Sequence, residues 1–445
     1  MTWYWALILM LAAFMVLLAA GLPVVFAFFA VNIGGALLFM GGEAGLQQLV
    51  RNAYDAVTNI SLSPIPLFIL MGEVMYQTGL AGRAIDAVDK LIARIPGRLS
   101  LVAIISGTIF SALSGSTIAN TAMLGSTLVP EMARRGYHPH MAMGPILGTG
   151  GIAMLIPPSA LGVLLASLGG LPVADLLIAT ILPGVAMAGL FFGYVVLRCT
   201  LNPRLAPAYD VGRLSIWQRM MPFLLRVVPL LLIFVVVVGS MFAGIASPNE
   251  ASALGAVATV IAAAAYRCLT VRTLMRSLLE TAKLSVMILF IICASITFSQ
   301  ILSLSNATEG MMQVLDVKTM SPLLLIVAMM VILLILGCFM DQVSMMLITL
   351  PFYMPIVKLL HFDFVQPEMV QIWFGVMMMI ALEIGFTTPP FGMLLFVMKG
   401  VAPAETRMST IMKAAMPFIL LEVATLLLVM AVPWLATWLP GLISK

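Results

Sequence analysis

The chain has 445 residues, of which 62% are hydrophobic and 9% are charged, with a formal net charge of +4. Soluble domains average about 25% charged residues, so this composition indicates a polytopic membrane protein. The basic residues are scattered among short loops, which excludes the basic face of a nucleic-acid-binding protein. Neither a disulfide framework nor a metal site is indicated, because the four cysteines share no close spacing and the three histidines lack neighbouring ligands.

Apolar runs long enough to cross a bilayer core of about 30 Å recur along the chain. The N-terminal MTWYWALILM lacks the basic region of a cleavable signal peptide, so we expect it to be retained as the first span. Two other apolar regions are interrupted by polar or Gly-containing tips and predict re-entrant hairpins, at 100–130 and 322–357. The ten expected spans are 3–20, 22–40, 64–79, 141–168, 174–197, 227–245, 250–266, 279–304, 369–398 and 416–438.

The distribution of Lys and Arg tests this topology, because cytoplasmic loops hold most basic residues. With the N-terminus outside, the predicted inner segments hold all but four of the 22 basic residues, the exceptions being Arg51, Lys318, Lys358 and Lys445. The first hairpin is then expected on the cytoplasmic side and the second on the external side. Two amphipathic segments, 81–98 and 405–416, predict helices that lie in the membrane interface.

The two hairpins belong to two versions of one unit. SGSTIANTAMLGSTLVP is followed by GPILGTGGIAMLIPPSALG, and GCFMDQVSMMLITLP is followed by GVMMMIALEIGFTTPPFG. Each unit has a Gly-containing tip, a helix that reaches a proline, and a span interrupted by a double proline. Because the two units are expected on opposite membrane sides, they form an inverted repeat, and broken spans in matching positions point to a transport site near the bilayer midplane.

The breaks predict the chemistry of the site. Proline at 157 or 389 removes a helix hydrogen bond and leaves carbonyl groups that can face a cation. Together with the hydroxyls of Ser114, Ser116, Ser159, Thr387 and Thr388 they make an oxygen-rich, largely neutral cage that suits Na⁺. The helices that begin at the tips favour an anion beside it. The alternative for a single SGS is close helix packing, which does not require a symmetric Pro-Pro break.

Two acids compete for an ionic role at membrane depth. Asp341 is the acid within a hairpin tip, and Glu383 lies in the matching broken span. An ionisable group at this depth is a functional hypothesis, while a capping or structural role is the alternative for Glu383.

Six motifs in order resemble the large membrane subunit of tripartite ATP-independent periplasmic (TRAP) transporters over almost the full chain. They are SGSTIAN, PEMARRGY (130–137), IPPSALG (156–162), GIASPNEASALG (244–255), GCFMDQVS (337–344) and TTPPFG (387–392). The resemblance implies an all-α polytopic membrane protein with an inverted-repeat, elevator-type fold, in a bacterial inner membrane. It implies sodium-driven import of an organic acid anion, such as a dicarboxylate, a sialic or other sugar acid, or a keto acid. It also implies two partners, a small four-helix membrane subunit and a periplasmic substrate-binding protein.

The resemblance further implies site residues. The first sodium site maps to Ser114, Ser116, Ile156 and Pro158, and the second to Gly337, Asp341, Thr387 and Thr388. Substrate or gate positions map to Gly115, Asn120, Gly150, Gly151, Pro157, Ser159, Gly385, Pro389 and Pro390. Asn120 is assigned to hairpin support, and Asn249 with Glu250 to a structural turn.

The chain is therefore expected to be one membrane unit, with a transport domain formed by 99–200 and 320–438 and a scaffold with arm helices formed by 1–98 and 201–319. A stand-alone carboxylate transporter that needs no binding protein is the alternative. An enzyme is disfavoured, because no nucleophile, base and orienting acid recur at plausible spacing. A scaffold protein is disfavoured, because it would not need matched, polar broken helices.

Overall fold

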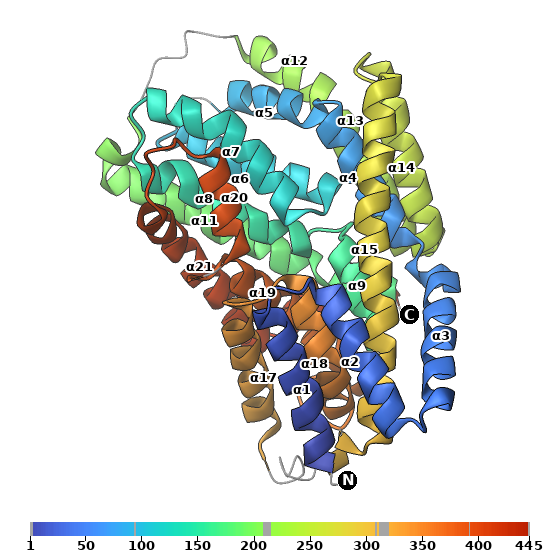
Figure 1. Cartoon of the computed structure of the whole chain (residues 1–445). Helices are drawn as coiled ribbons and strands as arrows, with labels where there is room; N and C mark the ends of the chain where they lie inside the picture. The colour runs from blue at the N-terminus through green and yellow to red at the C-terminus, as the bar shows by residue number, and fades with distance from the viewer. Residues whose placement is uncertain are drawn as a thin grey trace.

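The computed structural model describes residues 3–92, 95–207, 215–307, 309–310, 320–390 and 392–443, and all regular secondary structure in these ranges is helical (Figure 1). Arg94, Arg213, Lys318, Phe391 and Lys445, which took part in the sequence predictions, lie outside the described residues. The longer helices are α1 (Trp3–Ala19), α2 (Val24–Phe39), α3 (Glu43–Thr58), α4 (Pro64–Gln77), α5 (Leu80–Leu91), α6 (Arg98–Ser114), α7 (Thr117–Arg134), α8 (Pro139–Leu155), α9 (Ala160–Gly169), α10 (Val173–Ala179), α11 (Ile181–Leu201), α12 (Ile216–Arg226), α13 (Val228–Phe242), α14 (Pro248–Ala265), α15 (Val271–Leu304), α17 (Pro322–Gly337), α18 (Gln342–Val357), α19 (Pro367–Thr387), α20 (Met393–Val401) and α21 (Met408–Ala431).

One group of helices packs around α15, the long yellow helix of Figure 1. Helices α2, α3 and α4 contact α15 directly, and α14 lies between α4 and α13. Hydrogen bonds from polar side chains join α2 and α3 to α15. Asn32 donates to the carbonyl of Ala294, and Asn52 donates to Thr297 Oγ1 at 3.1 Å. These buried donor bonds fix the position of one helix against its neighbour, because an amide N–H left unpaired inside the protein would be unfavourable.

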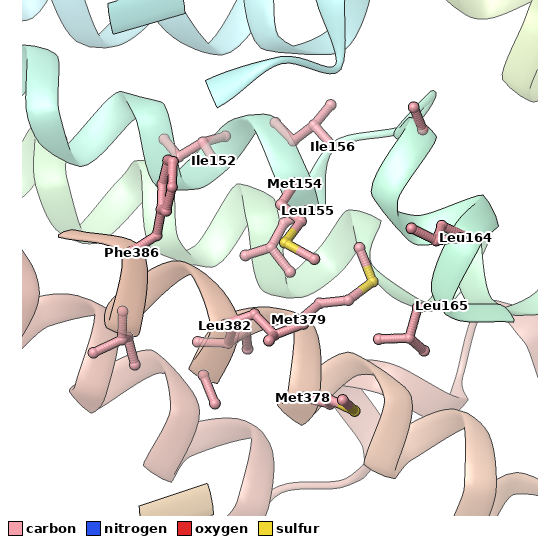
Figure 2. Packing of buried hydrophobic residues seen from close by; sticks show 14 of the residues in the cluster. Ile152, Met154, Leu155, Ile156, Leu164, Leu165, Met378, Met379, Leu382 and Phe386 are labelled. Atoms are coloured by element: carbon pink, nitrogen blue, oxygen red, sulfur yellow. The ribbon is translucent and has the colours of Figure 1, made fainter. Parts of the chain in front are cut away.

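A second group is built around the two broken spans, α8 with α9 and α19 with α20. Helix α8 contacts α6, α7, α19 and α21, while α19 also contacts α17 and α18. Apolar side chains fill the interface between α8 and α19, including Ile152 and Leu155 on one side and Met379, Leu382 and Phe386 on the other (Figure 2). The hairpins of the two repeats are therefore joined through their broken helices.

Within the described residues, five helices are long and apolar enough to cross a membrane, and up to seven spans result if each of two bent helix pairs is one span. The bent pairs are α8 with α9, at 44°, and α12 with α13, at 42°. Helices α1 and α2 match expected spans but are shorter apolar helices, so the ten expected spans include segments below the usual crossing length. In α19 94% of the apolar window is buried, against 44% in α21.

Two local expectations differ from the structure. Residues 405–416 do not form a separate interfacial helix, because Met408 begins the continuous helix α21, whose Ile411, Ala414 and Ala415 are buried in the bundle. The segment 81–98 is divided, since α5 ends at Leu91 and Arg98 already begins α6. The pattern also missed α3, whose mixed composition lacks a long apolar run.

Candidate functional site

The first hairpin tip lies between α6 and α7. Helix α6 ends at Ser114, and Gly115 has a φ of +56°, a conformation that residues with a Cβ rarely adopt. Ser116 caps α7, because its Oγ accepts a hydrogen bond from the Ala119 N–H at 3.3 Å. A Cβ added at Gly115 would lie 2.7 Å from the carbonyl oxygen of Pro158, so the tip rests on the break between α8 and α9.

The second tip has the same construction with different residues. Helix α17 ends at Gly337, and Asp341 caps α18 by accepting from the N–H groups of Val343 and Ser344 at 3.0 and 3.2 Å. A Cβ added at Gly337 would lie 2.2 Å from Cα of Gly385, which allows no side chain at this contact. The residues predicted for each sodium site thus come from a tip and from the broken span packed against it.

The breaks themselves are alike in the two repeats. Both contain a cis peptide bond between the two prolines, Pro157–Pro158 and Pro389–Pro390. In the first break Ser159 caps α9 through a hydrogen bond from the Gly162 N–H at 3.2 Å. In the second, the hydroxyls of Thr387 and Thr388 donate to carbonyls one turn earlier in α19, which leaves oxygen lone pairs available to a cation.

A cavity of about 740 Å³, here called the central cavity, lies where both tips face the group around α15. Ser114, Gly115, Ser116 and Thr117 line it from the first tip, and Asp341, Gln342 and Val343 line it from the second. Helices α2, α4 and α15 supply the opposite wall, which includes Glu73 and Lys283. The N-terminal ends of α7 and α18 therefore border one space, and the positive ends of their helix dipoles favour an anion there.

The charges on the wall of the central cavity are few. Lys283 Nζ lies 2.7 Å from Glu280 Oε1 on the same helix, and Glu73 accepts from Gln77 Nε2 at 3.2 Å. Asp341 is the acid on the tip side. The cavity thus combines hydroxyl and carboxylate oxygens at the tips, helix N-termini and one Lys within an otherwise mostly apolar wall.

Of the predicted substrate or gate positions, Gly115 lines the central cavity, whereas Asn120, Gly150, Gly151, Pro157, Ser159, Gly385, Pro389 and Pro390 do not. Asn120 is fully buried, and its Nδ2 donates to Ser111 Oγ at 2.8 Å and to the carbonyl of Thr149 at 3.0 Å, which joins the first hairpin to α8. Gly150 faces Thr121, and a Cβ added at Gly151 would lie 2.6 Å from Glu422 Oε1. Asn120, Gly150 and Gly151 therefore have a packing role outside the central cavity.

Glu383 lies at the junction of the two tips. It is fully buried, and its Oε2 accepts hydrogen bonds from Thr117 Oγ1 at 3.2 Å and from Gln342 Nε2. The sequence reasoning considered Glu383 but missed Thr117, Gln342 and Glu422. An acid within the apolar run of α21 was a usable signal for Glu422, whereas nothing in the pattern distinguished Thr117 or Gln342.

Together these observations define the class of protein, a polytopic inverted-repeat membrane transporter with two hairpins and two broken spans. Residues 11–435 match the family model described as the DctM component of tripartite ATP-independent periplasmic transporters, and the chain belongs to this family. It is accordingly a transporter subunit and not an enzyme, and it is an integral inner-membrane protein.

Similar proteins agree with this membership. The chain is 31% identical, over 94% of each sequence, to the 2,3-diketo-L-gulonate TRAP transporter large permease protein YiaN of Escherichia coli (strain K12). It is 28% identical to the C4-dicarboxylate TRAP transporter large permease protein DctM of Pseudomonas aeruginosa, over 92% of this chain and 93% of the relative. The crystal structure of the Alcanivorax borkumensis YdaH transporter shares the fold, with a TM-score of 0.61 at 15% identity over 89% of this chain and 90% of that one.

Proposed function

We propose that this chain is the large permease of a sodium-driven importer that takes up an organic acid anion. Membership of the family and the substrates named for its relatives, a diketogulonate and C4-dicarboxylates, support the substrate class. The observation that carries the proposal is the central cavity, which both hairpin tips and one Lys line together. Na⁺ binds to oxygen atoms at each tip, and the anion lies between the N-terminal ends of α7 and α18.

The proposed sodium ligands are the predicted ones. Ser114, Ser116 and the backbone of Ile156 and Pro158 form the first set, and Gly337, Asp341, Thr387 and Thr388 form the second. Residues that fit Na⁺ in this way offer hydroxyl, carboxylate and carbonyl oxygens, which are the ligands preferred by hard cations. Each set joins a tip to its own broken span, so cation binding would hold the tip closed.

The movement in this proposal is an elevator. The transport domain, 99–200 and 320–438, moves as a unit against the scaffold formed with 1–98 and 201–319. Support comes from the packing, because α8 and α19 join the two repeats into one body while the central cavity lies at its boundary with α2, α4 and α15. A small four-helix membrane subunit and a periplasmic binding protein are the partners, and the binding protein delivers the anion.

Replacement of Asp341 by Ala tests the second sodium site. We expect the Na⁺ concentration for half-maximal uptake to rise about 10-fold, since a lost contact to a charged group is worth about 1.5 kcal/mol. The measurement is uptake into proteoliposomes that hold the permease with its small subunit, with the binding protein supplied outside. Asp363→Ala, in an exposed loop, is the matched control. Unchanged sodium stimulation in Asp341→Ala would remove this residue from the site.

The same assay separates this proposal from a stand-alone transporter. Uptake should require the binding protein at substrate concentrations near its affinity, because the permease receives the anion from it. Equal uptake with and without the binding protein would favour the stand-alone alternative.

A further inference from the structure

Both hairpin tips are hydrogen-bonded to one oxygen atom of Glu383. Thr117 and Gln342 occupy the same position in their repeats, since each is the first residue of the helix that leaves a tip. Their side chains donate to Glu383 Oε2, and all three side chains are buried. Two hairpins more than 200 residues apart in the sequence therefore meet at a single acceptor.

The second repeat has this acceptor, whereas the matching position of the first repeat has none. Glu383 precedes the first proline of its break by six residues, and the residue in the same position of the first repeat is Gly151. A Cβ added at Gly151 would lie 3.0 Å from Cγ of Glu383 and 2.6 Å from Glu422 Oε1, so the space beside this glycine is occupied by the two carboxyl side chains. The structure departs from twofold symmetry here, and one carboxyl serves both halves.

We propose that Glu383 is a positioning residue that couples the two hairpin tips, so that closure of one tip favours closure of the other. This inference rests on the proposed function for its transport consequence, because the tips carry the proposed sodium ligands. Ser116 and Asp341 directly precede the two donors, so a displaced donor also displaces a cap and the ligands beside it. Coupling of this kind needs a contact that both tips share, so that losing the bond to one tip changes the other tip. Glu383 Oε2 is that shared contact.

Hydrogen exchange measures the coupling without reference to any ion. The protein is the permease with its small subunit in nanodiscs, and the peptides of interest cover 114–121 at the first tip and 338–345 at the second. Gln342→Met removes the donor at the second tip, and we expect it to accelerate exchange at 114–121 by about 2- to 12-fold, the range for one hydrogen bond. Thr117→Val should do the same at 338–345.

Variants of Glu383 distinguish a bridge from simple packing. Glu383→Met keeps an unbranched side chain of similar volume but removes the acceptor, so exchange should rise at both tips. Adding Gln342→Met to Glu383→Met should have no further effect on exchange at the first tip. Glu383→Gln keeps an oxygen acceptor and should restore much of the protection. The control for Glu383 is Glu422→Met, because Glu422 is equally buried but bonds to neither tip.

Thr121→Val is the control for Thr117→Val. Thr121 lies one turn further along α7, is fully buried, and its hydroxyl has no hydrogen-bond partner among the described residues. Its replacement should leave exchange at 338–345 unchanged. If Thr117→Val and Gln342→Met each changed hydrogen exchange only in their own hairpin, the inferred coupling would be overturned.

The transport readout is the Hill coefficient for Na⁺ in proteoliposomes. We expect a value above 1 in the wild type, close to 1 in Glu383→Met, and near the wild-type value in Glu383→Gln. An unchanged coefficient in Glu383→Met contradicts the inference. A wild type without sodium dependence contradicts the proposed function instead, while the exchange experiment still decides whether the bridge couples the tips.

Discussion

Glycine residues permit the closest backbone contacts at the two tips. Gly337 meets the backbone of Gly385, and Gly72 of α4 meets the backbone of Ser114, where an added Cβ would lie 2.5 Å from the carbonyl oxygen. Neither neighbour is a flexible side chain end, so the backbone itself would have to move. These glycines therefore determine how closely a tip approaches its broken span and the opposite wall of the central cavity.

Gly337→Ala tests this close approach. We expect a loss of about 1–3 kcal/mol in the free energy of unfolding and a fall in uptake, because the added methyl group overpacks a backbone contact. Thermal unfolding in detergent and uptake in proteoliposomes are the measurements. Gly189→Ala in α11 is the matched control, since no atom of the described residues lies within 4 Å of its added Cβ, and we expect it to be neutral or stabilising. Equal behaviour of the two variants would contradict the argument.

Some helices in this protein begin at side-chain caps, both in the site and outside it. Ser159 caps α9 at the first break, and Ser247 caps α14, where it forms a capping box with Glu250. The two serines do the same local work, since each accepts from the N–H three residues later. Of these two helices, α9 begins at a break that touches a hairpin tip and α14 does not, so the same substitution should have different consequences in them.

Ser159→Ala and Ser247→Ala form a matched pair. Each should lower the free energy of unfolding by about 0.5–2 kcal/mol, the usual range for a lost N-cap. Uptake at subsaturating Na⁺ should fall in Ser159→Ala only, because the loosened start of α9 adjoins Gly115 at the first tip. A similar decrease of uptake in both variants would mean that stability alone accounts for the effect.

The elements that sequence reasoning predicted well are those with a repeated signal. Both hairpins were found within a few residues because Gly-containing tips and double prolines recur in the two halves. Helix α3 was missed because it lacks a long apolar run, and the start of α21 was misassigned because an amphipathic pattern does not reveal whether lipid or another helix covers the apolar face. No sequence pattern marks Thr117 or Gln342, because the tertiary fold alone brings them to Glu383.

The whole molecule has a sidedness that follows from the inverted repeat. Arg134 is the last residue of α7, before the connection to α8 on the expected cytoplasmic side, and Lys358 follows α18 on the expected external side. Both residues are exposed, so each can carry a reporter without disturbing the packed interior. If the two repeats are inverted, the ends of the two hairpin units must face opposite compartments.

Single cysteines at these two positions test the inversion. In a variant whose four native cysteines are replaced, a membrane-impermeant maleimide should label Lys358→Cys in spheroplasts and Arg134→Cys only after permeabilisation. The basic residues on the inner side predict this direction. Labelling of both positions in intact spheroplasts would contradict the opposite orientation of the repeats.

The burial of α19 has a consequence for how the bilayer acts on this protein. Because nearly all of its apolar window is covered by other helices, the helix that carries Glu383 and Thr387 has little contact with lipid. In helices such as α21, less than half of the window is buried, so these helices meet the acyl chains directly. A change in bilayer thickness therefore strains the outer helices first, and the polar interior is insulated from hydrophobic mismatch.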